Sequence, residues 1–383
     1  MNKVSKKDIL NFKNMEIERK KIIRKSNMKP IIVDYQVNEL GKLLHPEIQY
    51  VKVLEVIKEN DDVKTFVLGP DKDKNFNNLA YFKAGQCVSV SVKIGVGVYQ
   101  RPYTISCSPS MALENKYMIT IKRVEGGIVS NYFLDEVEEG YTFSLSAPFG
   151  DFFYSRIRDA YHVIALADEN GIMPFISMAE AIYDNIEDFD LTIIYSAKTK
   201  DDLIFRERLD NIVCKLERVN VIYVLSEEDD NEFIKGLIDK EIIEKFMKED
   251  NSFFVCGSLD FYAYINKILK EFNLPKKYIR HDMFMGNIEL DDCKEYKLTI
   301  LTDEEEYHLI CSENKTLLET MEESGIVIPN KCHVGECGYC RSKLVKGKIK
   351  TFDENVRVSN ELHDFVHPCC SFPLSDVVIK LPN

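Results

Sequence analysis

The chain has 383 residues, 45% of them hydrophobic and 30% charged, which is typical of a soluble protein of two to four domains. No apolar run approaches the roughly 18 residues of a membrane span, and the start has no continuous apolar segment of the signal-peptide type. The net charge is −13, but residues 1–30 carry ten Lys and Arg against three Asp and Glu, which leaves −20 on the remainder. An acidic body argues against nucleic-acid binding. Eleven cysteines without an export signal predict a reducing, cytoplasmic location.

Residues 1–45 form a basic N-terminal extension with weak helical periodicity, since Ile9, Phe12, Ile22 and Ile23 are scattered along it. Charge runs of this kind are usually solvated or partly disordered. We therefore predict a solvated segment, and its sequence indicates no function.

Residues 46–155 consist of short alternating runs such as QCVSVSVKI and YMITIKRV, separated by Gly, Pro and Asn. This pattern predicts a small antiparallel β-barrel. The segment RPYTIS, residues 101–106, places a cation, an aromatic ring and a hydroxyl along one strand. The segment GGIVS, residues 126–130, places a glycine pair before a predicted helix, where backbone N–H groups can bind phosphate. Each segment alone has a structural explanation, as strand polar residues or as a loop before a helix, but together they favour a flavin site.

Residues 156–288 alternate between strands and helices, as where YHVIALA leads into PFISMAEAIYD and FFVCGS leads into LDFYAYINKILKEF. Such alternation predicts a doubly wound parallel α/β sheet. Ligands of sheets of this kind bind at the carboxyl ends of the strands. A nucleotide-binding type of domain is therefore expected here.

Residues 294–383 contain the most specific motif, the run C-x4-C-x2-C formed by Cys332, Cys337 and Cys340, with Cys369 as a fourth candidate further on. This is the plant-type ferredoxin spacing, in which four thiolates hold a [2Fe–2S] cluster. Two glycines within the loop let the backbone approach closely and direct N–H groups at the sulfurs. A structural zinc site favours two short knuckles, and only one is present; a disulfide framework belongs to small secreted chains. We therefore predict a [2Fe–2S] cluster.

The flanks of the cysteine loop complete this last domain. A strand pair, YKLTIL and EYHLIC, precedes a helix predicted from Thr316 to Ser324, and VVIKL forms a closing strand.

These blocks in this order resemble the ferredoxin–NADP reductase superfamily with a C-terminal plant-type ferredoxin domain of β-grasp fold. They are similar to the reductase components of aromatic-ring oxygenases and to the reductase of the hybrid-cluster protein, over nearly everything after residue 45. The resemblance implies FAD, with FMN as the alternative, a [2Fe–2S] cluster, and NADH or NADPH as substrate. It also implies an electron-acceptor partner, either an oxygenase or an anaerobic reductase component.

By this resemblance RPYTIS corresponds to the family's R-x-Y-[ST] flavin motif. Arg101 would bind flavin phosphate, Tyr103 would stack on or beside the flavin, and Thr104 would approach flavin N5. The other flavin-binding residues that the resemblance implies are Pro102, Gly126, Gly127, Ile128 and Ser130.

The resemblance also assigns the nicotinamide side of the site. FFVCGS resembles the family's C-G-P segment, which places Cys256 near hydride transfer, although a small buried core cysteine is almost as good an interpretation. Phe284 would lie near the flavin face, so the implied catalytic residues are Thr104, Cys256 and Phe284. The implied nucleotide-binding residues are Gly171, Pro174, Cys256 and Gly257. Pro373, four residues after Cys369, selects Cys369 rather than Cys370 as the fourth ligand.

One departure from the family pattern affects the nucleotide site. The family reads A-G-G-x-G-I-T-P where this chain reads ADENGIMP, so Asp168 and Glu169 replace two glycines, and Ser258 replaces the proline of C-G-P. Two unit charges ~4 Å apart repel by about 4 kcal/mol at an effective dielectric near 20, or roughly a thousandfold in affinity. Either the acids turn away from the nucleotide pyrophosphate, or the pocket has lost ordinary NAD(P)H binding.

Two hypotheses follow. In the first, the protein is an NAD(P)H-dependent reductase that passes electrons through flavin and cluster to a partner protein. In the second, it is an electron-relay subunit that does not oxidise NAD(P)H, with the nucleotide fold kept as a docking scaffold. The remaining histidines do not form a ligand-spaced pair on a readable helix, so we expect satisfied surface or loop side chains at His281, His308, His333, His363 and His367.

Overall fold

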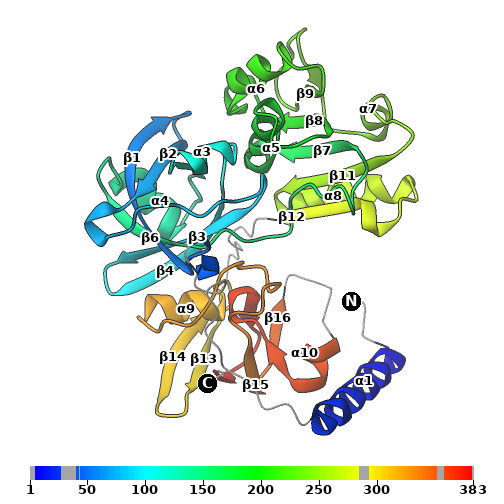
Figure 1. The fold of residues 1–383 in the computed structure, drawn as a ribbon. Coiled ribbons are helices and arrows are strands. Elements are labelled where there is room, and N and C mark those ends of the chain that lie inside the picture. Colours follow the sequence, from blue (N-terminus) through cyan, green and yellow to red (C-terminus); the bar gives the residue numbers. More distant parts are fainter. Residues whose placement is uncertain (1–4, 27–39, 43, 284–292, 352–357, 382–383) are drawn as a thin grey trace. The chain divides into compact units, whose positions relative to one another are not determined.

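The structure is a computed structural model that describes residues 5–26, 40–42, 44–283, 293–351 and 358–381 (Figure 1). It divides into two compact units, each of which is described by itself. One unit comprises residues 43–92 and 101–286, and the other comprises residues 1–42, 93–100 and 287–383.

The predicted barrel is a six-stranded sheet in the order β4-β3-β6-β1-β2-β5 (Figure 1). Its strands are β1 (Ile48–Lys58), β2 (Val63–Pro70), β3 (Cys87–Ile94), β4 (Gly97–Thr104), β5 (Tyr117–Lys122) and β6 (Thr142–Ser146), with the short helices η1 (Lys72–Lys74), α3 (Ser110–Leu113) and α4 (Ile128–Glu136) between them. Strand β1 pairs antiparallel with β2 and β6, β2 with β5, and β3 with β6. A bridge between Ile105 and Ile119 joins the residue after β4 to β5, so the two edge strands of the sheet meet. The predicted antiparallel flavin-barrel architecture is confirmed.

The nucleotide-type domain is a six-stranded parallel sheet in the order β10-β9-β8-β7-β11-β12. Its strands are β7 (His162–Asp168), β8 (Asp190–Ala197), β9 (Val219–Leu225), β10 (Ile234–Lys235), β11 (Asn251–Gly257) and β12 (Ile279–Met283). Its helices are η2 (Glu169–Ile172), α5 (Met173–Tyr183), η3 (Lys200–Asp202), α6 (Arg206–Val213), α7 (Lys240–Glu244), α8 (Leu259–Glu271) and η4 (Lys276–Tyr278).

Alternation along β7 explains why both faces of this sheet are covered. Val163 and Ala165 point into the core that contains α5 and α6, whereas Ile164 and Leu166 point into the core that contains α7 and α8. A strand that is buried on both faces has a continuous apolar sequence, as the run HVIALA does. The predicted doubly wound sheet is therefore confirmed.

Within this unit, polar contacts join the barrel to helix α5. Ser177 Oγ on α5 donates to the carbonyl of Cys107 at 2.6 Å. Glu180, also on α5, accepts from Ser108 N at 3.0 Å and from the Arg208 guanidinium at 2.6 Å. These bonds hold the loop after β4 against the helix that follows β7, so the barrel strand with the RPYTIS motif is anchored to the nucleotide-type sheet.

The C-terminal domain has a mixed five-stranded sheet in the order β14-β13-β19-β15-β17 and a two-stranded sheet of β16 and β18. The strands are β13 (Glu295–Leu301), β14 (Glu306–Ser312), β15 (Ser342–Lys346), β16 (Ile349–Thr351), β17 (Phe365–Val366), β18 (Ser371–Pro373) and β19 (Val377–Lys380), and the helices are α9 (Leu317–Glu323), α10 (Val358–His363) and η5 (Pro368–Cys370). Strands β13 and β19 run parallel, while β13 and β14 form an antiparallel pair. Thr316 caps α9 through a capping box with Glu319, which explains why the helix begins there. The expected ferredoxin-type domain is confirmed.

The N-terminal extension contains α1 (Lys6–Lys25), a 20-residue helix with no buried residue. The exposure of this helix agrees with the predicted solvated segment. The helix is continuous over 20 residues, which the weak helical periodicity of the sequence did not predict. A capping box between Ser5 and Asp8 starts the helix, and its many Lys, Glu and Arg residues are good helix formers. Glu16 on α1 lies 3.2 Å from His363 Nε2 on α10. Among the described residues, no helix is long and apolar enough to cross a membrane.

Candidate cofactor and nucleotide sites

The four predicted cluster cysteines converge in the C-terminal domain. Cys340 Sγ lies 3.3 Å from Cys369 Sγ, and Cys332 Sγ accepts from Cys337 N at 3.4 Å. The Cys332 sulfur also contacts those of Cys337 and Cys369. The loop of residues 332–340 and the turn η5 therefore bring all four sulfurs into one contiguous group.

The four thiols of this group hydrogen-bond to one another. These bonds lower the pKa of the Cys332 and Cys340 thiols and raise the pKa of their partners Cys337 and Cys369, so the protons of the group are shared among the sulfurs. Thiolates rather than thiols are metal ligands. The donor set therefore suits an iron–sulfur cluster.

Two glycines give the cysteine loop its backbone conformation, and one of them is also closely packed. Gly335 and Gly338 adopt φ of +77° and +78°, a region that favours glycine. A Cβ at Gly335 would lie only 2.7 Å from Cys370 Sγ, so Cys370 packs against the loop from behind. The geometry fits a backbone folded closely around a compact group.

His367 adds a residue that sequence reasoning missed. It was expected to be a satisfied surface or loop side chain, and it does lie in the loop between β17 and η5, but its side chain is buried beside Cys340 rather than at the surface. Its Nε2 lies 3.1 Å from Asn360 Nδ2. Hydrogen bonding from the imidazole also lowers the pKa of the Cys340 thiol. A polar ring beside a candidate ligand sulfur is a further feature that suits a bound cluster.

In the barrel, the predicted flavin residues lie consecutively on β4. Arg101, Pro102 and Tyr103 are half-buried, and Thr104 is buried at the end of the strand. The Tyr103 ring lies 6.4 Å from the ring of Phe133 on α4. Burial raises the pKa of the Tyr103 phenol, so it stays neutral. The strand offers a cation, a flat neutral ring and a hydroxyl in sequence, as a flavin site requires.

The glycine pair precedes α4 as the sequence predicts. Gly126 has φ of +67°, and Gly127 is the N-cap of α4, which begins at Ile128. A Cβ at Gly127 would lie 2.6 Å from Ser130 Oγ, and this hydroxyl accepts from Val124 N at 3.2 Å. Ser130 thus holds the turn in shape. In the described structure no side chain caps the first turn of α4, so its N–H groups are suited to a phosphate.

The nucleotide crevice is located by the topology of the parallel sheet. From β7 the chain builds outward through β8, β9 and β10, then returns to place β11 on the other side of β7. This reversal makes the carboxyl ends of β7 and β11 the topological switch point, where such sheets bind ligands. The predicted residues Gly171, Pro174, Cys256 and Gly257 all lie at or next to these ends.

Close backbone packing shapes this crevice. A Cβ at Gly171 would lie 1.9 Å from the carbonyl oxygen of Cys256, so only glycine lets the turn after β7 pack on β11. Burial, followed by the charges of Asp282 and Asp168, raises the pKa of the Cys256 thiol, which is therefore neutral. Phe284, the third predicted catalytic residue, lies outside the described residues.

The two acids that depart from the family pattern point in different directions. Asp168 turns across the crevice, where Oδ1 accepts from Ser258 N at 3.2 Å and Oδ2 accepts from Ser258 Oγ at 2.8 Å. Glu169 forms an ion pair with Lys122 at the end of β5, and Tyr195 Oη donates to the Glu169 carbonyl at 3.0 Å. Burial raises the pKa of Asp168, and the two Ser258 hydrogen bonds oppose that rise. Sequence reasoning identified these acids but not their partners.

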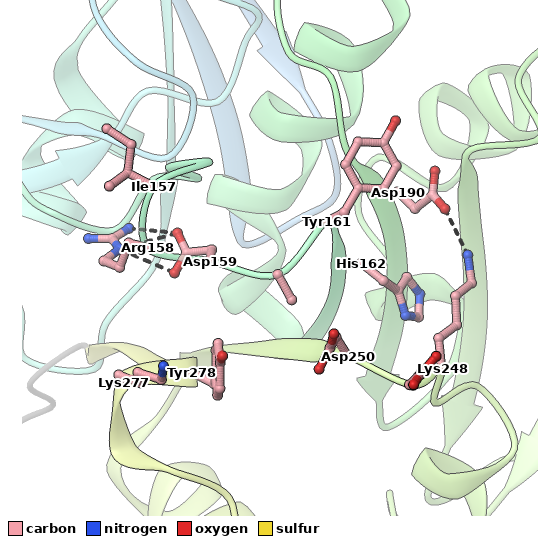
Figure 2. A pocket seen from close by; sticks show the side chains of 12 residues that line it. Ile157, Arg158, Asp159, Tyr161, His162, Asp190, Lys248, Asp250, Lys277 and Tyr278 are labelled. Carbon is pink, nitrogen blue, oxygen red and sulfur yellow. Dashed lines mark hydrogen bonds and ion pairs between the residues drawn. The ribbon is translucent and has the colours of Figure 1, made fainter.

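A pocket of about 420 Å³ lies at the opposite, amino-terminal edge of the same sheet (Figure 2). Its charged lining is largely paired within itself, since Asp159 binds Arg158 and Asp190 binds Lys248 (Figure 2). None of the predicted site residues lines it.

Comparisons with known proteins agree with the three-domain arrangement. Residues 50–154 match the oxidoreductase FAD-binding domain family, residues 170–267 the oxidoreductase NAD-binding domain family, and residues 301–374 the 2Fe-2S iron-sulfur cluster binding domain family. The glycine betaine monooxygenase reductase subunit of Chromohalobacter salexigens is 26% identical over 357 residues, with 86% of this chain and 94% of the relative covered. The stachydrine N-demethylase reductase subunit of Rhizobium meliloti is 24% identical over 345 residues, with coverage of 84% and 93%.

Among solved structures, phthalate dioxygenase reductase matches with a TM-score of 0.67 at 20% identity, covering 87% of this chain and 98% of that one. At this identity the match establishes the fold.

The fold, the sites and the relatives define a class of modular reductases that combine a flavin barrel, a nucleotide-binding sheet and a ferredoxin domain in one chain. The chain resembles the ferredoxin–NADP reductase superfamily, in the branch with a C-terminal plant-type [2Fe–2S] domain, and it combines the FAD-binding, NAD-binding and 2Fe-2S domain families in that order. It is an NAD(P)H-dependent oxidoreductase that transfers electrons through FAD and a [2Fe–2S] cluster to a partner protein. When bound, a flavin accepts two electrons as hydride and can release them singly to a cluster that accepts one.

Proposed function

We propose that this protein is the reductase component of an oxygenase system, which takes electrons from NADH and delivers them one at a time to a terminal oxygenase. The observation that carries this proposal is the coverage of the relatives. Reductase subunits of a monooxygenase and of a demethylase match 84–86% of the chain, so the similarity includes the flavin, nucleotide and cluster domains together. An electron-relay subunit without nucleotide oxidation has no comparable support. The eleven cysteines, all free of disulfides, support a reducing cytoplasmic location.

The charge distribution supports NADH over NADPH. In doubly wound folds the ribose that carries the extra phosphate of NADPH binds beyond the second strand, which is β8 here. Lys200, just after β8, pairs with Glu228 at 3.3 Å and lies 3.9 Å from Asp230. The acidic run of residues 227–230 follows β9, the immediate neighbour of β8. A cation already paired with acids gives little stabilisation to an additional phosphate.

The proposed roles of the chain's own residues follow from their positions. Arg101 and the uncapped N–H groups of α4 bind the flavin phosphates, and the neutral ring of Tyr103 packs against the flavin. Thr104 would lie near the flavin N5 by the family resemblance, and Cys256 would line the nicotinamide side as a neutral thiol. Cys332, Cys337, Cys340 and Cys369 hold the cluster.

The first experiment tests electron entry. The protein is purified anaerobically, flavin and cluster are confirmed by absorbance, and NADH or NADPH is added in a stopped-flow instrument. We expect flavin bleaching with NADH, followed by reduction of the cluster, and slower bleaching at equal concentrations of NADPH. If dithionite reduces the flavin but neither nucleotide does so at millimolar concentration, the reductase function is refuted and the relay hypothesis replaces it.

The second experiment tests the partner. The reduced protein is cross-linked in an extract of its own source cells, the captured protein is identified by mass spectrometry, and the purified pair is supplied with NADH. An oxygenase that consumes oxygen only when NADH and this reductase are both present supports the proposal. Capture and reduction of an oxygen-independent reductase component would instead contradict it.

A further inference from the structure

Asp168 occupies the place in the crevice where a ligand is expected. It is the last residue of β7, and Ser258 directly follows β11, so the pair spans the switch point between these two strands. Both carboxylate oxygens are used, one by Ser258 N at 3.2 Å and the other by Ser258 Oγ at 2.8 Å. A Cβ at Gly257 would lie 2.0 Å from Asp168 Oδ1, so the carboxylate lies directly on the backbone at the end of β11.

Ser258 is well suited to hold this carboxylate. Its backbone N–H and its hydroxyl both donate to Asp168, while the same hydroxyl accepts from Phe261 N at 3.2 Å as the N-cap of α8. A proline at this position would supply neither donor. Two of the positions at which this chain departs from the family pattern, 168 and 258, therefore form a single interaction.

The surroundings do not neutralise an incoming pyrophosphate. Asp168 is flanked by Glu169, and Asp282 on β12 lies close enough to Cys256 to influence its thiol. Lys122 is the cation that acts on Asp168, but it already forms an ion pair with Glu169. A dinucleotide that enters this crevice therefore encounters the Asp168 carboxylate, which fills space at the ends of β7 and β11, has the same sign of charge as a pyrophosphate, and already accepts from the Ser258 donors.

We propose that Asp168 is an intramolecular competitor of the nucleotide: its carboxylate, held by Ser258, closes the crevice between β7 and β11, and NAD(P)H binds only when that carboxylate leaves Ser258. The inference rests on the proposed function, since it concerns the nucleotide that the reductase oxidises. This competition would allow the protein to oxidise NAD(P)H despite the acids in the loop after β7, because Asp168 would lower the affinity for NAD(P)H without abolishing its binding. The affinity for NADH is thus set by a side-chain displacement as well as by direct contacts.

The test compares four forms of the full-length holoprotein: the wild type, Asp168→Gly, Asp168→Asn and Asp250→Asn. The last is a charge-matched control, since Asp250 is an exposed carboxylate in the pocket at the opposite edge of the sheet. The concentration dependence of flavin bleaching by NADH yields the apparent Kd, and flavin and cluster absorbance verify that each variant is intact.

We expect Asp168→Gly to bind NADH tenfold or more tightly than the wild type, a change of about 1.4 kcal/mol. Asp168→Asn should fall between the two, because it removes the charge but keeps the bulk, and Asp250→Asn should match the wild type. Unchanged affinity in both Asp168 variants would overturn the inference, and so would weaker binding, because Asp168 would then be a ligand of the nucleotide.

The same experiment separates the two proposals. If NADH reduces the flavin in every form and binds more tightly to the Asp168 variants than to the wild type, both proposals are supported. If NADH and NADPH reduce the flavin in no form while dithionite does, the proposed function itself fails and the inference falls with it. If all forms are reduced with equal Kd, only the inference fails.

Discussion

Gly171 provides the sharpest test of how the nucleotide crevice is built. A Cβ at this position would lie 1.9 Å from the Cys256 carbonyl oxygen, 2.6 Å from its carbonyl carbon and 3.1 Å from Gly257 N. All three atoms belong to the backbone of β11, so no side chain can rotate away and the turn after β7 must shift instead. Overpacking of this kind costs about 1–3 kcal/mol, and the contact with main chain places Gly171→Ala near the upper limit.

The consequence of Gly171→Ala should be confined to the nucleotide side. We expect a lower urea midpoint for this unit and an NADH affinity weakened about tenfold or more, since each 1.4 kcal/mol is a factor of ten. Reduction of the flavin by dithionite and the cluster absorbance should stay unchanged, because the barrel strand β4 and the cysteine loop do not contain Gly171.

Gly41→Ala is the matched control for this substitution. No described atom lies within 4 Å of a Cβ at Gly41, and its φ lies outside the left-handed region. If Gly171→Ala had the same unfolding midpoint and NADH affinity as Gly41→Ala, the argument that close backbone contact shapes the crevice would be refuted.

Three further predictions concern stability and the cluster. The buried side chain of Asp159 binds the half-buried Arg158 at 3.0 Å and the half-buried Arg280 at 2.8 Å, so Asp159→Ala should lower the free energy of unfolding by about 1–3 kcal/mol in urea titrations, since both cations lose a hydrogen-bonded partner. Burial lowers the pKa of His162 below its ordinary 6.5. As the pH falls, the unfolded state therefore binds a proton at a higher pH than the folded state does, so the free energy of unfolding should fall below about pH 6.5. Urea titrations of His162→Gln should lack that decline. Cys337→Ser should abolish the cluster absorbance while NADH still bleaches the flavin at the wild-type rate.

Much of the fold could be predicted because its signals are local. The alternating runs of the barrel and the strand–helix alternation after residue 156 each reflect which faces are buried, and the structure confirms both architectures. The spacing of Cys332, Cys337 and Cys340 indicated the cluster for a similar reason, since one short loop must supply three ligands. The structure adds that Cys369 meets this loop at Cys340 Sγ, 3.3 Å away.

The candidate site was less predictable where partners lie far apart in the sequence. Asp168 and Ser258 were each recognised as unusual, but 90 positions separate them, and only the register that pairs Ala167 with Cys256 places them side by side. The burial of His367 beside Cys340 was not predicted, because it depends on the tertiary packing of the loop before η5, which the spacing of the cysteine motif does not encode.

The sequence by itself predicted the order of the three domains and the clustered Cys332, Cys337 and Cys340, because periodicity and short-range spacing encode them directly, whereas the flavin motif and the choice of Cys369 came from the family resemblance. Only the tertiary structure decided which way the two acids of the nucleotide loop point. Parallel pairing of β7 with β11 provides Asp168 with the donors of Ser258, and packing of the barrel against the sheet provides Glu169 with Lys122. The direction of each acidic side chain is set by hydrogen bonds and ion pairs to residues distant in the sequence, and those partners come together only when the sheet has formed.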